Sequence, residues 1–191
     1  MADLPVVYEN GCHLGIEPEA PAPGCRLGGS PKGPAVVLLG DSHAAQWLPP
    51  LLEVASGRGV ALWAWTKSSC PFADVTIWNG EARAPYRQCD RWRQAVLAEL
   101  AGLGPTTIFV SNLMDDATVL VERDSGALLR GQAAAAAALE LRSDRRVTVK
   151  AVIPRRRFFV VDDFVHHHVR LCQRVHGDAA QREIRHLITL R

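Results

Sequence analysis

The sequence has little of what membrane proteins and nucleic-acid-binding proteins share. None of its apolar runs approaches the roughly 20 residues that a membrane-spanning helix requires. The net charge of the 191 residues is only +2, so no strong attraction to a polyanion is expected. Aromatic residues make up 6% of the chain and do not interleave with the arginines of residues 142–157, which we interpret as a solvated face. These absences argue against a transmembrane helix and against a nucleic acid as partner.

The first five residues carry neither the basic nor the apolar region of a signal peptide. We therefore expect either a cytosolic protein or a piece of a longer exported chain. The five cysteines help to decide between these alternatives. Four of them flank two irregular stretches, Cys12 with Cys25 and Cys70 with Cys89. Because disulfides hold such loops together in oxidising compartments, the pattern favours the exported alternative over five reduced thiols.

Apolar periodicity predicts an α/β fold. Residues 35–40, 60–66 and 106–111 are expected to be buried strands, since they are apolar without alternation. A helix is expected over residues 43–56, kinked or starting late because of two prolines, and another from Asp90, as N-cap, to Leu100. With residues 67–88 as a loop, this order indicates a mostly parallel sheet with helices on its faces.

The two ends of the chain give weaker signals. Residues 1–34 are rich in Pro and Gly and are predicted to form a lead-in, followed by one α/β domain over residues 35–191. In the second half, a helix is expected over 131–141 and strands over 147–153 and 158–161.

Gly40-Asp41-Ser42-His43 directly follows the first predicted strand. Ligands of open α/β sheets bind at the carboxyl ends of the strands, and a serine there can be a nucleophile if a base reaches it. The alternative is an N-cap of the next helix, which uses the same residue types. Asp41 is expected to bind backbone N–H groups of the turn, and His43 to be a first-turn helix residue.

Several motifs occur together in one order: Gly11-Cys12-His13, Cys25, Val36 to Pro49, Thr66-Lys67-Ser68-Ser69-Cys70-Pro71, and Cys89 to Arg93. The set resembles the SGNH domain fused to the C-terminus of bacterial acyltransferase-3 (AT3) membrane proteins, over about residues 5–112. The resemblance implies a flavodoxin-like three-layer α/β/α sandwich of the SGNH hydrolase type, which works without a cofactor or metal. It also implies disulfides Cys12–Cys25 and Cys70–Cys89.

The resemblance further implies an activity and a location. Such domains lie outside the cytoplasmic membrane, tethered to the membrane protein. They transfer an acyl group, usually acetyl, from a donor delivered by the AT3 domain to a hydroxyl of a cell-surface glycan. The position that matches the nucleophile is Ser42.

The family's Asp-x-x-His motif has two partial matches in the divergent second half of the chain. Asp163-Phe164-Val165-His166 has the right spacing, follows an apolar run and precedes a helix's length of chain. Glu183-Ile184-Arg185-His186 lies only five residues from the end. We favour Asp163 and His166, with Glu183 and His186 as the alternative, although a divergent branch or a shifted reading frame would equally explain the unfamiliar half.

These residues together predict serine catalysis. His166 would take the proton of Ser42, and Asp163 would orient the imidazole. The oxyanion donors are expected to be the N–H of Ser42 and the side chain of Asn112, although Asn112 is equally well explained as a turn residue after a strand.

Three other functions remain open at this point. The same residues would serve a carbohydrate esterase with water as acceptor, and a chain without the triad would be an inactive remnant. A zinc site built from His168, Cys172 and His176 is disfavoured, because the outer two are about 12 Å apart on a helix. Without it, Cys172 is left unexplained.

Overall fold

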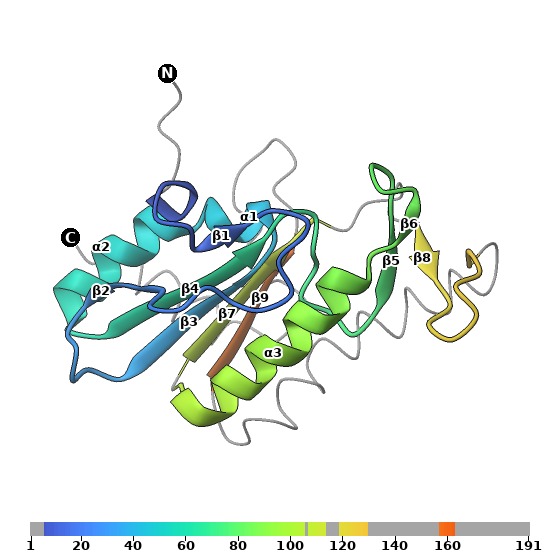
Figure 1. Cartoon of the computed structure of the whole chain (residues 1–191). Coiled ribbons are helices and arrows are strands. Elements are labelled where there is room, and N and C mark those ends of the chain that lie inside the picture. The colour runs from blue at the N-terminus through green and yellow to red at the C-terminus, as the bar shows by residue number, and fades with distance from the viewer. Residues whose placement is uncertain (1–5, 106, 114–118, 130–156, 163–191) are drawn as a thin grey trace.

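A parallel sheet forms the centre of the computed structural model, which describes residues 6–105, 107–113, 119–129 and, as backbone, 157–162. The parallel strands are β3 (Ala35–Gly40), β4 (Ala61–Lys67), β7 (Thr107–Asn112) and β9 (Arg157–Asp162). They lie in the order β4-β3-β7-β9 (Figure 1). The α/β fold with a mostly parallel sheet is confirmed. All four strands correspond to predicted ones, because β9 contains the strand expected over 158–161 and the other three match nearly residue for residue.

The helices cover both faces of the sheet. The chain steps from β3 to β4 through α1 (Ser42–Ala45) and α2 (Leu48–Arg58), and from β4 back past β3 to β7 through α3 (Arg87–Leu103). Because such crossovers are right-handed, steps in opposite directions place their helices on opposite faces. Figure 1 accordingly shows the sheet between α1 and α2 on one side and α3 on the other.

The two predicted helices differ from the observed ones at their starts. Residues 43–56 are divided into α1 and α2, because Pro49 and Pro50 occupy the first turn of α2, where proline is tolerated. The prediction that Asp90 caps α3 is wrong, since α3 begins at Arg87 and Asp90 lies inside its first turn. The Asp90 carboxylate instead accepts hydrogen bonds from Thr76 Oγ1, at 2.8 Å, and from Arg93 Nη2, at 2.6 Å.

The prediction of a loop over residues 67–88 is also wrong in part. A second, antiparallel sheet contains β5 (Thr76–Asn79), β6 (Ala84–Pro85) and β8 (Leu120–Val121). Two of these strands are only two residues long, and β5 depends on a partner more than 40 residues later in the chain. Such pairing leaves too little local pattern for sequence reasoning to detect.

The lead-in packs along the free edge of β4. After a 3₁₀ turn at Val6–Tyr8, β1 (His13–Leu14) pairs with the carboxyl half of β4, and β2 (Arg26–Gly29) pairs antiparallel with its amino half. The core beneath the sheet holds Trp92, Val96 and Leu100 of α3. The predicted helix 131–141 and strand 147–153 lie outside the described residues. No helix in the described part of the chain is long and apolar enough to cross a membrane.

Candidate active site

Ser42 is the first residue of α1, just beyond the carboxyl end of β3. The turn that presents it passes directly against β7. Gly40 has a φ of +138°, and a Cβ there would lie only 1.8 Å from the carbonyl oxygen of Ser111. Only glycine fits this backbone. The Gly40 turn therefore holds Ser42 at the edge where ligands of open α/β sheets bind.

Asp41 is the residue that caps α1. Its buried carboxylate accepts a hydrogen bond from the His43 N–H, at 2.8 Å, and a second from the Leu113 N–H, at 2.7 Å. Burial raises the pKa of this carboxyl, while the backbone hydrogen bonds oppose the rise. Since Asp41 supplies the N-cap and fastens the turn to the end of β7, the Ser42 hydroxyl is not the N-cap.

His43 lies in the first turn of α1, as expected. Its Nδ1 is 3.5 Å from Asp41 Oδ1. Nδ1 therefore faces the capping carboxylate without a hydrogen-bond partner among the described residues. That His43 does not serve Ser42 as base stays a prediction.

Asn112 lies beside this turn as the last residue of β7. Gly40 pairs with Ser111 across the two strands, so Asn112 is level with Asp41. The buried Asn112 side chain accepts a hydrogen bond from the Phe72 N–H, at 2.7 Å, 40 residues away in the chain. Its amide nitrogen is buried and has no hydrogen-bond partner within the described residues. A buried N–H₂ without an acceptor costs about 1–3 kcal/mol, so this nitrogen marks a position suited to a ligand oxygen.

The remaining candidate residues lie outside the described part of the chain. These are Asp163, His166, Glu183, His186 and the residues weighed for zinc, namely His168, Cys172 and His176. The backbone of β9 gives one relevant constraint, because Asp162 pairs with Asn112 at the carboxyl edge. Asp163 is the next residue in the chain, so the strand that precedes the favoured motif ends level with the Ser42 turn.

Lys67 and His13 line the other side of this edge, and sequence reasoning assigned them no role. The Lys67 side chain is fully buried, and its Nζ donates hydrogen bonds to the carbonyl oxygens of Gly15, Ile16 and Pro18, at 2.6, 2.7 and 2.7 Å. The ring nitrogens of His13 lie 2.9 Å from Thr66 Oγ1 and 3.0 Å from Ser68 Oγ. Burial and then the charge of Lys67 lower the pKa of His13, which keeps its ring neutral at pH 7.

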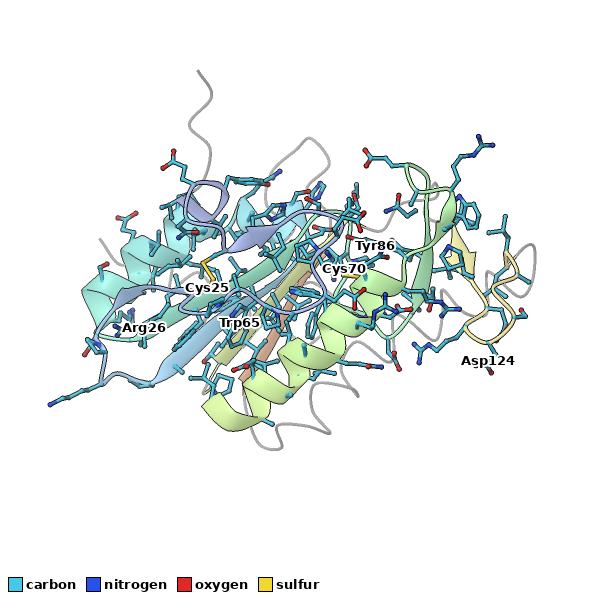
Figure 2. All side chains as sticks on the ribbon, in the orientation of Figure 1. Cys25, Arg26, Trp65, Cys70, Tyr86 and Asp124 are labelled. Atoms are coloured by element: carbon cyan, nitrogen blue, oxygen red, sulfur yellow. A yellow bond between two sulfur atoms is a disulfide. The ribbon has the colours of Figure 1, made fainter. Side chains whose placement is uncertain are left out.

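The segment after β4 is tied to α3. The disulfide Cys70–Cys89 joins them, just as Cys12–Cys25 joins the two lead-in strands, and both predicted pairs are present. Tyr86, the residue that precedes α3, donates its hydroxyl to the carbonyl oxygen of Ser68 at 2.9 Å, two residues before Cys70 (Figure 2). The buried Arg93 adds hydrogen bonds to the carbonyl oxygens of Pro71 and Val75, at 3.2 and 2.5 Å. These links hold the backbone around Phe72, which in turn binds Asn112.

Comparisons with known proteins agree with this architecture. A solved structure, the lipopolysaccharide acetyltransferase periplasmic domain of Salmonella ser. Paratyphi A, superposes with a TM-score of 0.51 at 15% sequence identity. The match covers 85% of this chain and 58% of that one, so the chain spans little more than half of that domain. At this identity the likeness concerns the fold. No curated protein matches the chain. A family model described as the SGNH domain fused to AT3 domains matches residues 11–187, and the chain therefore belongs to this family.

Proposed function

We propose that the chain is an O-acyltransferase domain, with Ser42 as the nucleophile that carries the acyl group. The observation that carries this proposal is the pairing of two features at one edge of the sheet. Ser42 begins α1 without serving as its cap, and the buried amide nitrogen of Asn112 lies level with the same turn without a partner in the described residues. Membership of the SGNH family supports an acyl-transfer or ester-cleaving activity in general.

The proposed reaction has two halves. Ser42 Oγ attacks the carbonyl carbon of the acyl donor while a histidine takes its proton, and the donor leaves with that proton. A sugar hydroxyl then attacks the carbonyl carbon of the acyl-serine and gives its proton to the same histidine. The bond between the acyl carbon and Ser42 Oγ breaks, and the histidine returns the proton to Ser42 Oγ. In both halves the Ser42 N–H and Asn112 Nδ2 would donate to the oxyanion.

We assign the histidine as His166, oriented by Asp163, with His186 and Glu183 as the alternative pair. The ending of β9 beside Asn112 supports the first pair, because Asp163 follows that strand directly.

The donor, the acceptor and the location follow from the family and the disulfides. We propose that a membrane AT3 domain delivers the acyl group, of which acetyl is the first candidate, and that a cell-surface glycan accepts it. Fusion to AT3 domains supports this donor. The disulfides Cys12–Cys25 and Cys70–Cys89 support an extracytoplasmic location, since such bonds persist in oxidising compartments.

A fluorophosphonate probe that reacts with activated serines tests the nucleophile. We expect labelling of the folded chain at Ser42, identified by peptide mass spectrometry, and its loss in Ser42→Ala. Ser56→Ala is the matched control, because Ser56 is exposed on α2 and should leave labelling unchanged. No labelling of Ser42 in folded protein would contradict both the transferase and the esterase alternatives and favour an inactive remnant. Acetyl transfer to a glycan, compared with hydrolysis of the same donor, separates transferase from esterase.

A further inference from the structure

A cavity of about 190 Å³ opens between the first half of α3 and the segment that follows the Cys70 disulfide. One side is apolar and the other carries charged and amide groups, and the lining residues are Phe72, Ala73, Asp74, Arg87, Asp90, Arg91, Arg93, Gln94, Leu97 and Arg123. A water molecule occupies about 30 Å³ of liquid, so the space would hold about six waters. This is the scale of a single sugar ring rather than of an extended chain.

The cavity shares a wall with the candidate active site. Phe72 lines it, and the backbone N–H of Phe72 donates to Asn112 Oδ1 at the carboxyl edge of β7. The Phe72 ring packs edge-to-face against Trp92, with ring centroids 6.0 Å apart, which fixes this wall on α3. Phe72 would therefore contact both a group bound in the cavity and Asn112, the proposed oxyanion donor.

The charge of the lining is positive. Four arginines face two aspartates, so the lining has a surplus of two positive charges. Glu19, outside the lining, forms an ion pair with Arg91 and reduces the surplus to one. Glu122 and Asp124, also outside the lining, interact electrostatically with Arg87 and Arg123. The remaining cations are Arg87 and Arg123 at the exposed side and Arg93 at the base.

Arg93 is rigidly held and is the least available of these cations. Its guanidinium donates to Asp90, to Cys89 Sγ and to the carbonyl oxygens of Pro71 and Val75. Arg93 and Asp90 thus form a fixed floor whose net charge is close to zero.

Arg87 and Arg123 are tied to one another and remain partly exposed. Arg87 Nη2 donates to the backbone carbonyl of Arg123, and Arg87 Nη1 lies 3.6 Å from Asp90 Oδ2. Arg123 Nη2 pairs with Asp74 at 2.5 Å. Their side chains are 35% and 49% exposed. A guanidinium has five N–H donors, and these contacts within the described residues use only a few of them. Arg87 and Arg123 line the same cavity, and guanidinium groups with donors to spare match the oxygens of a carboxylate or a phosphate.

We propose that this cavity binds the anionic group of the glycan acceptor, a sugar carboxylate or a sugar phosphate, with Arg87 and Arg123 as its ligands. That the bound sugar is the acceptor rests on the proposed function. The apolar wall of Phe72, Ala73 and Leu97 would pack against the ring of the same sugar.

The test is an NMR titration of the full-length ¹⁵N-labelled chain with glucuronate, glucose 6-phosphate and glucose as probes. We expect saturable shifts of backbone amides around Phe72 and Gln94 with one or both acidic sugars, and binding of glucose at least about tenfold weaker, because hydrogen bonds to charged groups contribute about 1.5–3 kcal/mol. The two acidic probes distinguish a carboxylate from a phosphate. Equal binding of glucose, or no shifts with any probe, overturns the proposal.

Variants then locate the site. Arg123→Gln and Arg87→Gln should each weaken binding of the acidic probe about tenfold or more, and Arg123→Lys should restore part of it. Arg58→Ala is the matched control, because Arg58 is an exposed arginine in the last turn of α2, outside the cavity lining. Thermal unfolding shows whether each variant is folded. If the Arg123→Gln variant and the Arg87→Gln variant each bind the acidic probe as tightly as the parent, the proposal is contradicted.

Fluorophosphonate labelling of the same samples separates this inference from the proposed function. If Ser42 reacts with the probe but no acidic sugar binds, the result supports the proposed acyl transfer and contradicts the proposed anion site. If an acidic sugar binds but Ser42 does not react, the cavity is an anion site and its role in holding an acceptor falls.

Discussion

Two segments flank the candidate active site, and each is held by one disulfide and one buried cation. The lead-in is closed by Cys12–Cys25, and its carbonyl oxygens bind Lys67. The segment after β4 is closed by Cys70–Cys89, and its carbonyl oxygens bind Arg93. The two arrangements differ in one respect. Arg93 is paired with the carboxylate of Asp90, whereas Lys67 Nζ donates its hydrogen bonds to carbonyl oxygens and lies over the ring of Tyr86, with no carboxylate in contact within the described residues.

This difference predicts different responses to pH. Burial lowers the pKa of Lys67 to about 8, with Glu17 and Glu19 opposing the change at a distance. Burial also lowers the pKa of Arg93, but Asp90 opposes it, and arginine stays protonated in proteins. The lead-in is therefore the side of the site whose buried charge depends on pH, and the α3 side keeps its charge.

The largest loss of stability is expected when the side chain of Arg93 is replaced. Arg93→Met leaves the Asp90 carboxylate without its buried partner and should lower the free energy of unfolding by about 3–5 kcal/mol. Arg91→Met is the control, because its solvent-exposed pair with Glu19 should contribute little to stability. Urea unfolding measures both. A loss below 1 kcal/mol for Arg93→Met would mean that the ion pair with Asp90 does not hold this segment.

Removing each disulfide compares the two sides directly. Cys70→Ala with Cys89→Ala, and Cys12→Ala with Cys25→Ala, open loops of 19 and 13 residues and should each cost about 3 kcal/mol. The first pair should also slow fluorophosphonate labelling of Ser42 by about tenfold or more, because Phe72 would no longer hold Asn112 in place. The second pair should leave the labelling rate nearly unchanged. Equal slowing by both would show that the two sides serve the site alike.

The pH dependence of stability sharpens the comparison on the Lys67 side. Above pH 8 the folded chain has released the Lys67 proton that the unfolded chain binds up to about pH 10.5, so unfolding takes up a proton. The free energy of unfolding should therefore rise by roughly 2 kcal/mol between pH 8 and pH 10 relative to Lys67→Met. Denaturant titrations across this range measure the difference, and parallel curves for parent and variant would contradict it.

His13 gives the smallest expected effect. Its pKa is lowered in the folded chain, so at pH values below 6.5 the unfolded chain binds a proton that the folded chain resists. Between pH 7 and pH 5 the stability of the parent should therefore fall more steeply than that of His13→Asn. Above pH 7 the two curves should run parallel, and parallel curves below pH 7 as well would contradict the prediction.

The parts of the fold that the sequence predicted are those with strong local patterns. The apolar runs of β3, β4 and β7 are continuous, and the prolines at the start of α2 mark its boundary without help from distant residues. The position of Ser42 was predictable for the same reason, because a residue that follows a buried strand and a glycine turn lies at the carboxyl edge of the sheet.

The parts that sequence reasoning missed depend on distant partners. Asp90 has the residue type of an N-cap, but Thr76 and Arg93 use its carboxylate instead. β5 pairs with a strand far along the chain, and Lys67 binds carbonyl oxygens about 50 residues before it. Lys67 belongs to the motif Lys-Ser-Ser-Cys-Pro, but the motif does not indicate that the Lys67 ammonium is buried, because its carbonyl partners lie far away in the sequence. The proposed Asp163 and His166 stay predictions.

The short strands β1 and β2 have a consequence for how the domain behaves in solution. They occupy the outer edge of β4, one along each half, and an exposed strand edge is a template for pairing with another molecule. A version of the domain that starts at residue 35, where the sequence suggests a boundary, would uncover the polar backbone of β4. We expect such a truncated chain to self-associate through this edge. The lead-in would therefore prevent edge-to-edge pairing between copies of the domain.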